Sequence, residues 1–346
     1  MVRQPQPHNR CSIQGPQRGV ALLMVVFMIA LASALLISLT DSTYVAMRLN
    51  SAAEHRIKAE YILKSAVSVA QVLLKTDITS YDDPQQDAWM AFADGREVPG
   101  DMLGLTEPNI RVTLMIASKS GKIPLAKVWQ VGSTDTTWRD IVTALFRNLG
   151  FDTPAPNTNT SSSAPFVNAE EMVANLIDYL DPDQTNYQQN GFASGVEANL
   201  PDDVQFRNDK TIDSLASELA SIPGFTPGRI QKILPFVFVS TTSVRNEVNL
   251  NAAPYEVVAA MTDSTPAVKL LACRQNQGPF KNVVSDLQNC GVTITDPKIF
   301  SVSGTLYEVI AKVEYGTAAF TASAELKSPG SGNSGKLPTI TNFQVY

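Results

Sequence analysis

The first feature of the hydrophobic pattern is an uncharged, apolar run from Val20 to Thr40. About 20 apolar residues at ~1.5 Å per residue match a bilayer hydrocarbon core of about 30 Å, so the run predicts a membrane-spanning helix. Upstream of it there is no acidic residue, and three arginines are present: Arg3, Arg10 and Arg18. Because a basic flank stays cytoplasmic, the chain is expected to cross the membrane once, with its amino end inside.

A cleavable secretory signal peptide is the alternative interpretation of this run, because such peptides also begin with basic residues. Ala32, Ser33 and Ala34 offer small residues for a cleavage site. The apolar region of a signal peptide is shorter, however, and Gly and Pro are absent from Val20 to Asp83, so nothing interrupts a helix there. The pattern therefore favours a membrane anchor that continues as a helix.

Beyond the membrane, this helix is predicted to become amphipathic and to continue to about Lys75. Apolar residues recur there at steps of three and four, the spacing of one buried helical face. They are Ala59, Ile62, Leu63, Ala66, Val69, Ala70, Leu73 and Leu74. We expect this face to pack on a domain outside the membrane.

The rest of the chain shows strand patterns near its two ends and helix patterns between them. Alternating apolar residues predict strands over 110–116, 299–303, 307–313 and 318–326. Helical spacing predicts helices over 138–149, 169–180, 212–220 and 228–234. This order indicates an α+β fold in which a large helical domain is inserted into a domain with a small β-sheet.

Composition is that of a folded protein with no sign of catalysis. The 346 residues are 44% hydrophobic, enough for a helix plus one or two globular units, and the net charge of -6 disfavours nucleic-acid binding. The two histidines are His8, before the membrane, and His55, on the long helix, so no Ser/His/Asp arrangement is expected in the globular part. A phosphate-binding glycine loop is also absent. We expect the protein not to be an enzyme.

The three cysteines are divided by the membrane span. Cys11 precedes the span, whereas Cys273 and Cys290 follow it. In an oxidising compartment the latter pair is expected to form a disulfide, which would contribute ~3 kcal/mol for a loop of this size. Two buried free thiols are the alternative.

One segment, from Ile222 to Ile230, resembles a helix-hairpin-helix, whose turn amides can hold a nucleic-acid phosphate. A membrane-anchored DNA-binding protein is therefore an alternative function. The region 215–290 carries six basic and five acidic residues, however, whereas phosphate binding requires a basic face. The pattern favours a packing turn over a DNA-binding one.

The basic leader, Gly19 and the long helix together resemble type IV pilin-like proteins. The resemblance implies that a prepilin peptidase recognises Arg18 and Gly19, cuts before Val20 and methylates the new amino terminus. Most members carry Glu at the fifth mature position, for pairing with a neighbour's terminal amine. This chain has Met24 there. An unpaired carboxylate in hydrocarbon is costly, so a subunit without that pairing is better served by an apolar residue.

In lacking this Glu, the chain resembles one group of type IV pilin-like proteins, the K-type minor pseudopilins of type II secretion systems. Three stretches of the middle section resemble the same family in the same order: Asn175 to Asp183, Ser214 to Pro227 and Val248 to Val258. The resemblance implies a subunit of the bacterial inner membrane that initiates and caps a periplasmic pseudopilus at its tip. Its implied partners are minor pseudopilins of the I, J and H types and the inner-membrane assembly platform. A minor pilin of a type IV pilus is an alternative.

Calcium is the one cofactor that the resemblance implies, at an acidic segment after the predicted helix 169–180. Asp181, Asp183, Glu197 and Asp202 could supply the oxygen ligands that calcium prefers. Ala198 stands where the family carries another carboxylate, so a solvated helix end without metal is the alternative.

The predicted organisation has six parts. Residues 1–19 form the leader, 20–40 the transmembrane segment and 41–80 the periplasmic part of the long helix. Residues 81–130 and 291–326 form the pilin-like sheet domain, 131–290 the inserted helical domain and 327–346 a flexible tail rich in Ser and Gly at its start.

Overall fold

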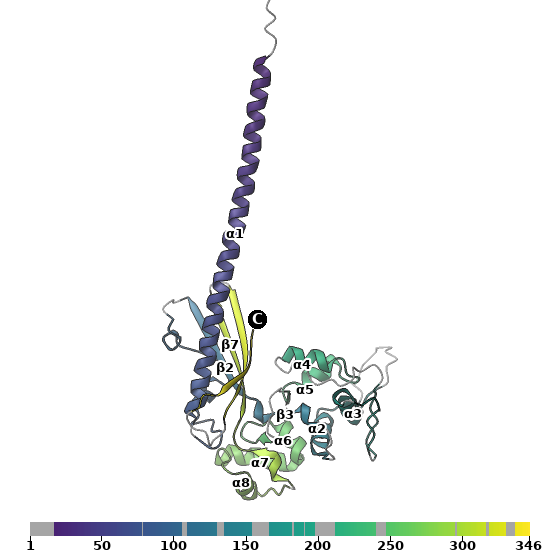
Figure 1. Ribbon diagram of the computed structural model, residues 1–346. Coiled ribbons are helices and arrows are strands. Elements are labelled where there is room, and N and C mark those ends of the chain that lie inside the picture. Colours follow the sequence, from purple (N-terminus) through teal and green to yellow (C-terminus); the bar gives the residue numbers. More distant parts are fainter. Residues whose placement is uncertain are drawn as a thin grey trace, which may run out of the picture. The chain divides into compact units, whose positions relative to one another are not determined.

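The computed structural model describes residues 17–77, 79–105, 109–129, 135–153, 166–181, 183–189, 191–197, 212–239, 247–294, 296–315, 318–329 and 336–346. Two units are distinguished, Met1–Lys58 and Ala59–Tyr346. The helix α1 (Gln17–Thr76) begins in the first unit and ends in the second (Figure 1).

In the first unit, α1 is uncharged and largely apolar over residues 20–40, and the side chains of that run are exposed. The helix is long and apolar enough to cross a membrane, by length and composition. Ser33 Oγ donates to Ile29 O at 2.8 Å, and Thr40 Oγ1 donates to Leu36 O at 2.8 Å. These hydroxyls are therefore satisfied within the helix itself, as hydrocarbon surroundings require.

In the second unit, α1 packs on a five-stranded antiparallel sheet of order β1-β2-β7-β8-β9. The strands are β1 (Arg96–Glu97), β2 (Ile110–Ser118), β7 (Leu306–Tyr315), β8 (Ala318–Lys327) and β9 (Thr339–Val345). Alternation places Leu114 of β2 opposite Ala311 of β7, and both are fully buried. The predicted apolar face of α1 supplies Leu63 and Ala66 to the same core.

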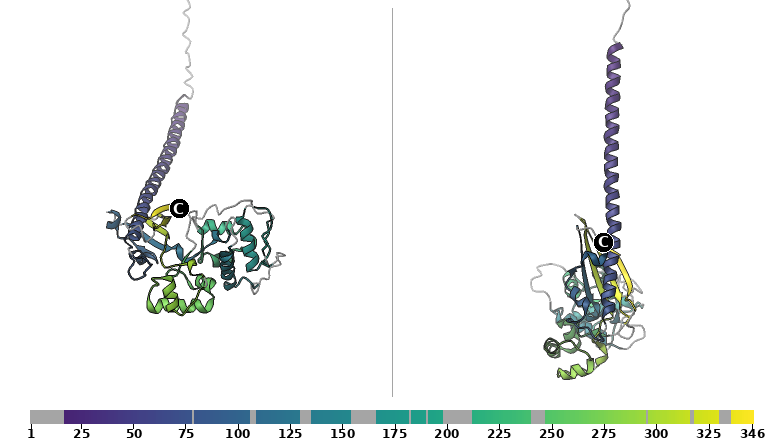
Figure 2. Two further views of the ribbon diagram at one scale, coloured as in Figure 1. Left: turned by 60° about the horizontal axis from the view of Figure 1, so that its bottom comes forward. Right: turned by 90° about the vertical axis from the view of Figure 1, so that its left-hand side faces the viewer.

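The chain between β2 and β7 forms a second, largely helical core. Its helices are α2 (Thr137–Asn148), α3 (Ala169–Leu180), α4 (Ile212–Leu219), α5 (Pro227–Ile233), α6 (Tyr255–Thr262), α7 (Ser264–Gln277) and α8 (Val283–Asn289). Two short parallel strand pairs accompany them, β3 (Ile123–Pro124) with β4 (Val237–Phe238) and β5 (Val248–Asn249) with β6 (Phe300–Ser301). The helices α6 to α8, green in Figure 2, lie within the range 131–290 of the predicted insertion, but they were not predicted as helices from the sequence.

Five short 3-10 helices complete the described elements. They are η1 (Ala88–Phe92), η2 (Gly100–Leu103), η3 (Lys119–Gly121), η4 (Leu125–Lys127) and η5 (Pro297–Ile299).

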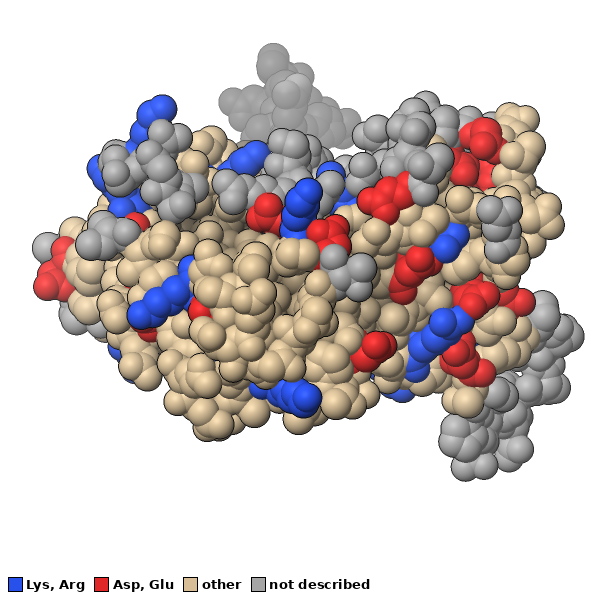
Figure 3. Space-filling view, turned by 90° about the horizontal axis from the view of Figure 1, so that it is seen from below, with Lys and Arg blue, Asp and Glu red and all other residues tan. Residues whose placement is uncertain are grey.

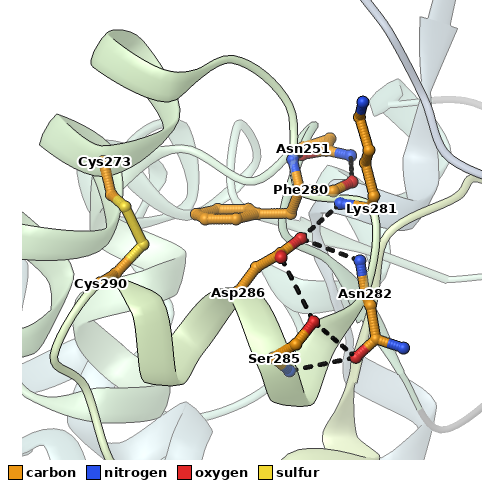
Figure 4. The surroundings of a disulfide bond; sticks show 8 residues. All are labelled: Asn251, Cys273, Phe280, Lys281, Asn282, Ser285, Asp286 and Cys290. Atoms are coloured by element: carbon orange, nitrogen blue, oxygen red, sulfur yellow. Dashed lines mark hydrogen bonds between the residues drawn. A yellow bond between two sulfur atoms is a disulfide. The ribbon is translucent and has the colours of Figure 1, made fainter.

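Cys273 of α7 and Cys290, directly after α8, form a disulfide with a Cα–Cα distance of 5.9 Å (Figure 4). Beside it, Asn282 caps α8 by accepting a hydrogen bond from Ser285 N, and Asp286 accepts one from Lys281 N. The covalent bond therefore joins two helices whose connecting turn is also held by side-chain caps.

The end of the chain differs from the predicted flexible tail over 327–346. Residues 339–345 form β9, which pairs with β8 in an antiparallel register. The physical reason is that Phe343 and Val345 alternate toward the sheet core and pack against it. Residues 330–335, in the Gly- and Ser-rich part of this range, lie outside the described residues.

Candidate functional site

The predicted processing site lies in the first turn of α1. The backbone of Arg18 and Gly19 is helical, and the side chain of Arg18 is outside the described set. Val20 and Met24 follow on the same helix, and Met24 is 66% exposed. The first acidic residue of α1 is Asp41, so the first turns of the helix can enter hydrocarbon without a carboxylate that needs a partner.

A cluster of carboxylates lies at the carboxyl end of α3. Asp178 is in the last turn and Asp181 follows as the C-cap, and their residues are only 1% and 4% exposed. Asp178 Oδ1 accepts a hydrogen bond from Tyr187 N at 2.6 Å. Asp178 Oδ2 and Asp181 Oδ1 are buried and accept none from the residues that the structure describes. Buried carboxylate oxygens without donors are costly, so this arrangement is suited to a cation.

The pKa values of this cluster reflect mutual repulsion in a buried place. Burial, together with the charges of Asp183, Asp178 and Glu197, raises the pKa of Asp181 to about 7. Burial also raises the pKa of Asp178 to about 6, against the Tyr187 N–H, which lowers it. A bound divalent cation would remove this repulsion and favour the ionised carboxylates.

Two further predicted ligands, Asp183 and Glu197, border this cluster. Asp183 is exposed, and its Oδ1 accepts hydrogen bonds from the backbone N–H and the hydroxyl of Thr185. Glu197 N donates to Asn186 Oδ1 at 3.1 Å, which places Glu197 on the loop after α3. Asp202 lies outside the described residues, as does Ala198.

Asp178 belongs to the cluster although it was not predicted from the sequence. The signal was present, because residues three apart lie on one side of a helix and Asp178 is three residues before Asp181. The loop returns closely to this point: a Cβ at Gly195 would overlap Asp178 Oδ2 and clash with Ala174 O. Gly195 is therefore needed for the close approach of the loop to α3.

A second acidic cluster was not predicted at all. Single carboxylate oxygens of Asp77, Asp82 and Asp87 lie within 4.8 Å of one another and could hold a metal ion. Both oxygens of Asp82 already accept hydrogen bonds, Oδ2 from Asn249 Nδ2 at 2.6 Å and Oδ1 from Gly304 N at 2.9 Å. Asp82 thus joins the loop after α1 to the helical insertion and to the segment before β7. Its partners are more than 160 residues away in the sequence, which hid it from pattern analysis.

This second cluster should make folding stability depend on pH. Burial raises the pKa of Asp82 from 3.8 to about 7 and that of Asp87 to about 6, and Asp77 contributes by repulsion. The folded state therefore keeps protons that the unfolded chain releases. The resulting stabilisation is fully present below pH 3.8 and is lost as the pH rises through about 7.

Urea unfolding of the chelator-treated chain across that pH range measures the effect. In Asp82→Asn, the free energy of unfolding is expected to change less across this pH range, by on the order of a few kcal/mol, because a neutral amide cannot release a proton. The exposed Asp94→Asn is the matched control and should leave the slope unchanged. An equal slope in Asp82→Asn and in the unaltered chain would contradict the assignment.

The segment that resembles a helix-hairpin-helix is a packing turn. Gly224 has φ 94°, and a Cβ there would meet the side chains of Val167 and Met172. Arg229 donates to Val167 O at 2.8 Å and to Gly224 O at 3.0 Å, and its guanidinium lies 5.2 Å from the Phe151 ring. The one arginine of this turn is therefore used internally.

The surface charge also does not favour a phosphate-binding face. On the face shown in Figure 3, Lys and Arg are scattered among Asp and Glu, with no continuous basic area. Arg274, on α7, donates to Leu250 O and Ala253 O. Phosphate recognition needs basic groups that are free to reach the backbone of a nucleic acid.

Comparison with known proteins finds similarity both in sequence and in structure. No protein-family model matches the chain. The chain is 26% identical over 245 residues to the type II secretion system protein K of Escherichia coli (strain K12). This match spans 68% of the chain and 66% of that relative, slightly less than two thirds of its length.

One similar structure is a chain in the crystal structure of the GspK-GspI-GspJ complex from the type II secretion system of enterotoxigenic Escherichia coli. The TM-score is 0.56 at 15% sequence identity, and the match covers 86% of this chain and 99% of the other. At that identity the match shows the fold, and the predicted α+β class is confirmed. The predicted resemblance is also confirmed: this chain is similar in sequence to a type II secretion system protein K and in fold to a chain of a complex that contains GspK.

Proposed function

We propose that this chain is a minor pseudopilin of a type II protein secretion system, which initiates the periplasmic pseudopilus and caps it at its tip. The observation that carries the proposal is the architecture of the chain. An apolar helix continues into a sheet domain and packs on its sheet, and a large helical insertion lies between β2 and β7. The similar sequence is named for type II secretion, and the similar fold occurs in the GspK-GspI-GspJ complex. These parts together support a filament subunit and not an enzyme.

The tip position is supported by Met24 and by the insertion. With Met24 at the fifth mature position, α1 has no acidic residue before Asp41, so this subunit has no carboxylate to pair with the terminal amine of a subunit ahead of it. The insertion adds a second core of buried residues to the pilin-like domain. Such a mass obstructs the addition of another subunit above this one, as a cap requires.

Processing and location follow from the same proposal. A prepilin peptidase recognises Arg18 and Gly19, and the mature chain begins at Val20. The protein is anchored in the bacterial inner membrane by α1, with its amino end in the cytoplasm and its globular part in the periplasm. There the spans of I-, J- and H-type minor pseudopilins pack beside α1, and the assembly platform receives the complex.

Calcium binds, in this proposal, at the carboxyl end of α3. Asp178 and Asp181 supply buried oxygens, and Asp183 and Glu197 supply charge at the border of the site. Asp202, on the following segment, is the remaining predicted ligand. A hard cation with flexible coordination suits a set of carboxylates on a helix end and a loop.

Co-purification of the tagged full-length chain with its minor pseudopilins from detergent-solubilised membranes tests the function. We expect I- and J-type subunits in a stable complex, and loss of protein export when the gene is deleted. Unchanged export together with pseudopili of normal length in the deletion strain would overturn the proposal. Tight DNA binding by the chain, weakening steeply with salt, would favour the DNA-binding alternative instead.

A further inference from the structure

The last strand of the sheet, β9, leaves one of its edges open. Tyr346 and Thr321 exchange both backbone hydrogen bonds, N to O at 2.8 Å and O to N at 3.4 Å. In an antiparallel pair the residues alternate, so Phe343 and Val345 direct their N–H and C=O groups away from β8. In the part of the chain that the structure describes, no backbone hydrogen bond reaches these four groups.

The two edges of the sheet are protected very differently. At the opposite edge, β1 is two residues long and both are charged, Arg96 and Glu97. Short, charged edge strands are the usual protection against pairing with another chain. β9 is seven residues long, and 339–346 contains no charged residue and no proline. Its one irregularity is a bulge opposite Glu325 and Leu326, which leaves 342–346 regular.

Side chains beside this edge define what kind of strand fits. Phe343 and Val345 face the core under α1, whereas Gln344 and Tyr346 face the other side, where Tyr346 Oη lies 3.1 Å from Gln344 Oε1. On the α1 side, the Lys64 ammonium lies 5.9 Å from the ring centroids of both Phe343 and Tyr61, and Tyr61 is 68% exposed. An added strand would therefore place apolar residues toward Tyr61 and polar residues toward Gln344.

We propose that the open edge of β9 pairs with an extended segment of a neighbouring subunit, uncharged and alternating between apolar and polar residues. The backbone groups of Phe343 and Val345 supply the affinity, and the exposed ring of Tyr61 selects the apolar positions. The identity of the neighbour as another pseudopilin rests on the proposed function. The pairing itself does not.

Residue-resolved hydrogen exchange on the full-length chain in detergent tests this pairing with a defined probe, a capped peptide of alternating valine and threonine. Without the peptide, the amides of Phe343 and Val345 should exchange at least about tenfold faster than those of Gln344 and Tyr346, which bond to β8. Saturating peptide should slow Phe343 and Val345 by about tenfold or more and leave the other two unchanged.

Two proline variants form a matched pair. Val345→Pro removes an outward N–H and keeps the β8 ladder, so the fold should persist while peptide protection at Phe343 is lost. Gln344→Pro removes a ladder N–H and should speed the exchange of all of β9. Protection by peptide in Val345→Pro equal to that in the unaltered chain would overturn the assignment of the edge.

The remaining outcomes separate the possible occupants. Protection of Phe343 and Val345 in the co-purified complex supports a neighbouring subunit. Concentration-dependent dimerisation of the chain alone, abolished by Val345→Pro, would mean that a second copy occupies the edge and would overturn the proposed occupant. Amides that stay exposed with both peptide and complex would overturn the pairing altogether. Because the peptide experiment needs no partner protein, its result stands even if co-purification fails.

Discussion

Addition of about 1 mM Ca²⁺ to the chelator-treated full-length chain is expected to raise its thermal unfolding midpoint by roughly 5–10 °C. The reason is the carboxylate cluster at the end of α3, in which Asp178 Oδ2 and Asp181 Oδ1 are buried and accept no hydrogen bond from the described residues. A cation that binds only the folded state at about 100 times its dissociation constant stabilises it by ~2.7 kcal/mol. Differential scanning calorimetry or circular dichroism would measure the shift.

Asp181→Asn separates metal binding from repulsion among the acids. Without calcium, at a pH above 7, this variant should be more stable than the unaltered chain, because burial raises the pKa of Asp181 to about 7 and its charge is unfavourable there. With calcium, the variant should lose most of the midpoint shift. Asp94→Asn is the exposed control and should keep the full shift. A shift that survives in Asp181→Asn would place the calcium elsewhere.

Lys119→Met is expected to lower the free energy of unfolding by ~3–5 kcal/mol. Lys119 Nζ lies 3.0 Å from Glu325 Oε2, and the two side chains are only 9% and 7% exposed. Thr341 Oγ1 also donates to Glu325 Oε1 at 2.9 Å, so this pair connects η3, β8 and β9. Removing the ammonium leaves a buried carboxylate without its counter-ion. Urea unfolding of the full-length chain measures the loss.

The same substitution at an exposed ion pair is the control. Lys312 Nζ lies 2.7 Å from Glu314 Oε1 with both side chains nearly half exposed, so Lys312→Met should cost less than about 1 kcal/mol. Replacing Glu325 by Gln in the Lys119→Met background should recover part of the loss, because no unpaired buried charge remains. Equal effects of Lys119→Met and Lys312→Met would show that the buried pair is not a stabilising connection.

Local patterns were sufficient for the elements whose formation depends on nearby residues. The absence of Gly and Pro predicted α1 to about Lys75, and it ends at Thr76. Alternation predicted strands over 307–313 and 318–326, which lie within β7 (Leu306–Tyr315) and β8 (Ala318–Lys327). Each of these elements carries its own periodicity, and burial of one face is enough to select it.

Long-range pairing was not visible in the sequence. β9 follows a stretch rich in Gly and Ser, so its short alternation was hidden within a predicted tail, and only pairing with β8 identifies it. For the same reason Asp82 gave no signal, because its donors are Asn249 and Gly304. At the α3 cluster the sequence predicted Asp181, Asp183, Glu197 and Asp202 as ligands, and the return of Gly195 onto Asp178 adds a carboxylate that was not predicted.

The direct pairing of β2 with β7 makes the pilin-like sheet topologically independent of the insertion. Ser118 and Tyr307 are opposite each other in the register, so the chain leaves and re-enters the sheet at neighbouring points. The two strands are the arms of one antiparallel hairpin, and the helical domain is its loop. Each doubling of such a loop adds only ~0.6 kcal/mol of closure cost. Insertions of quite different size could therefore occupy this position while the register of the sheet stays the same.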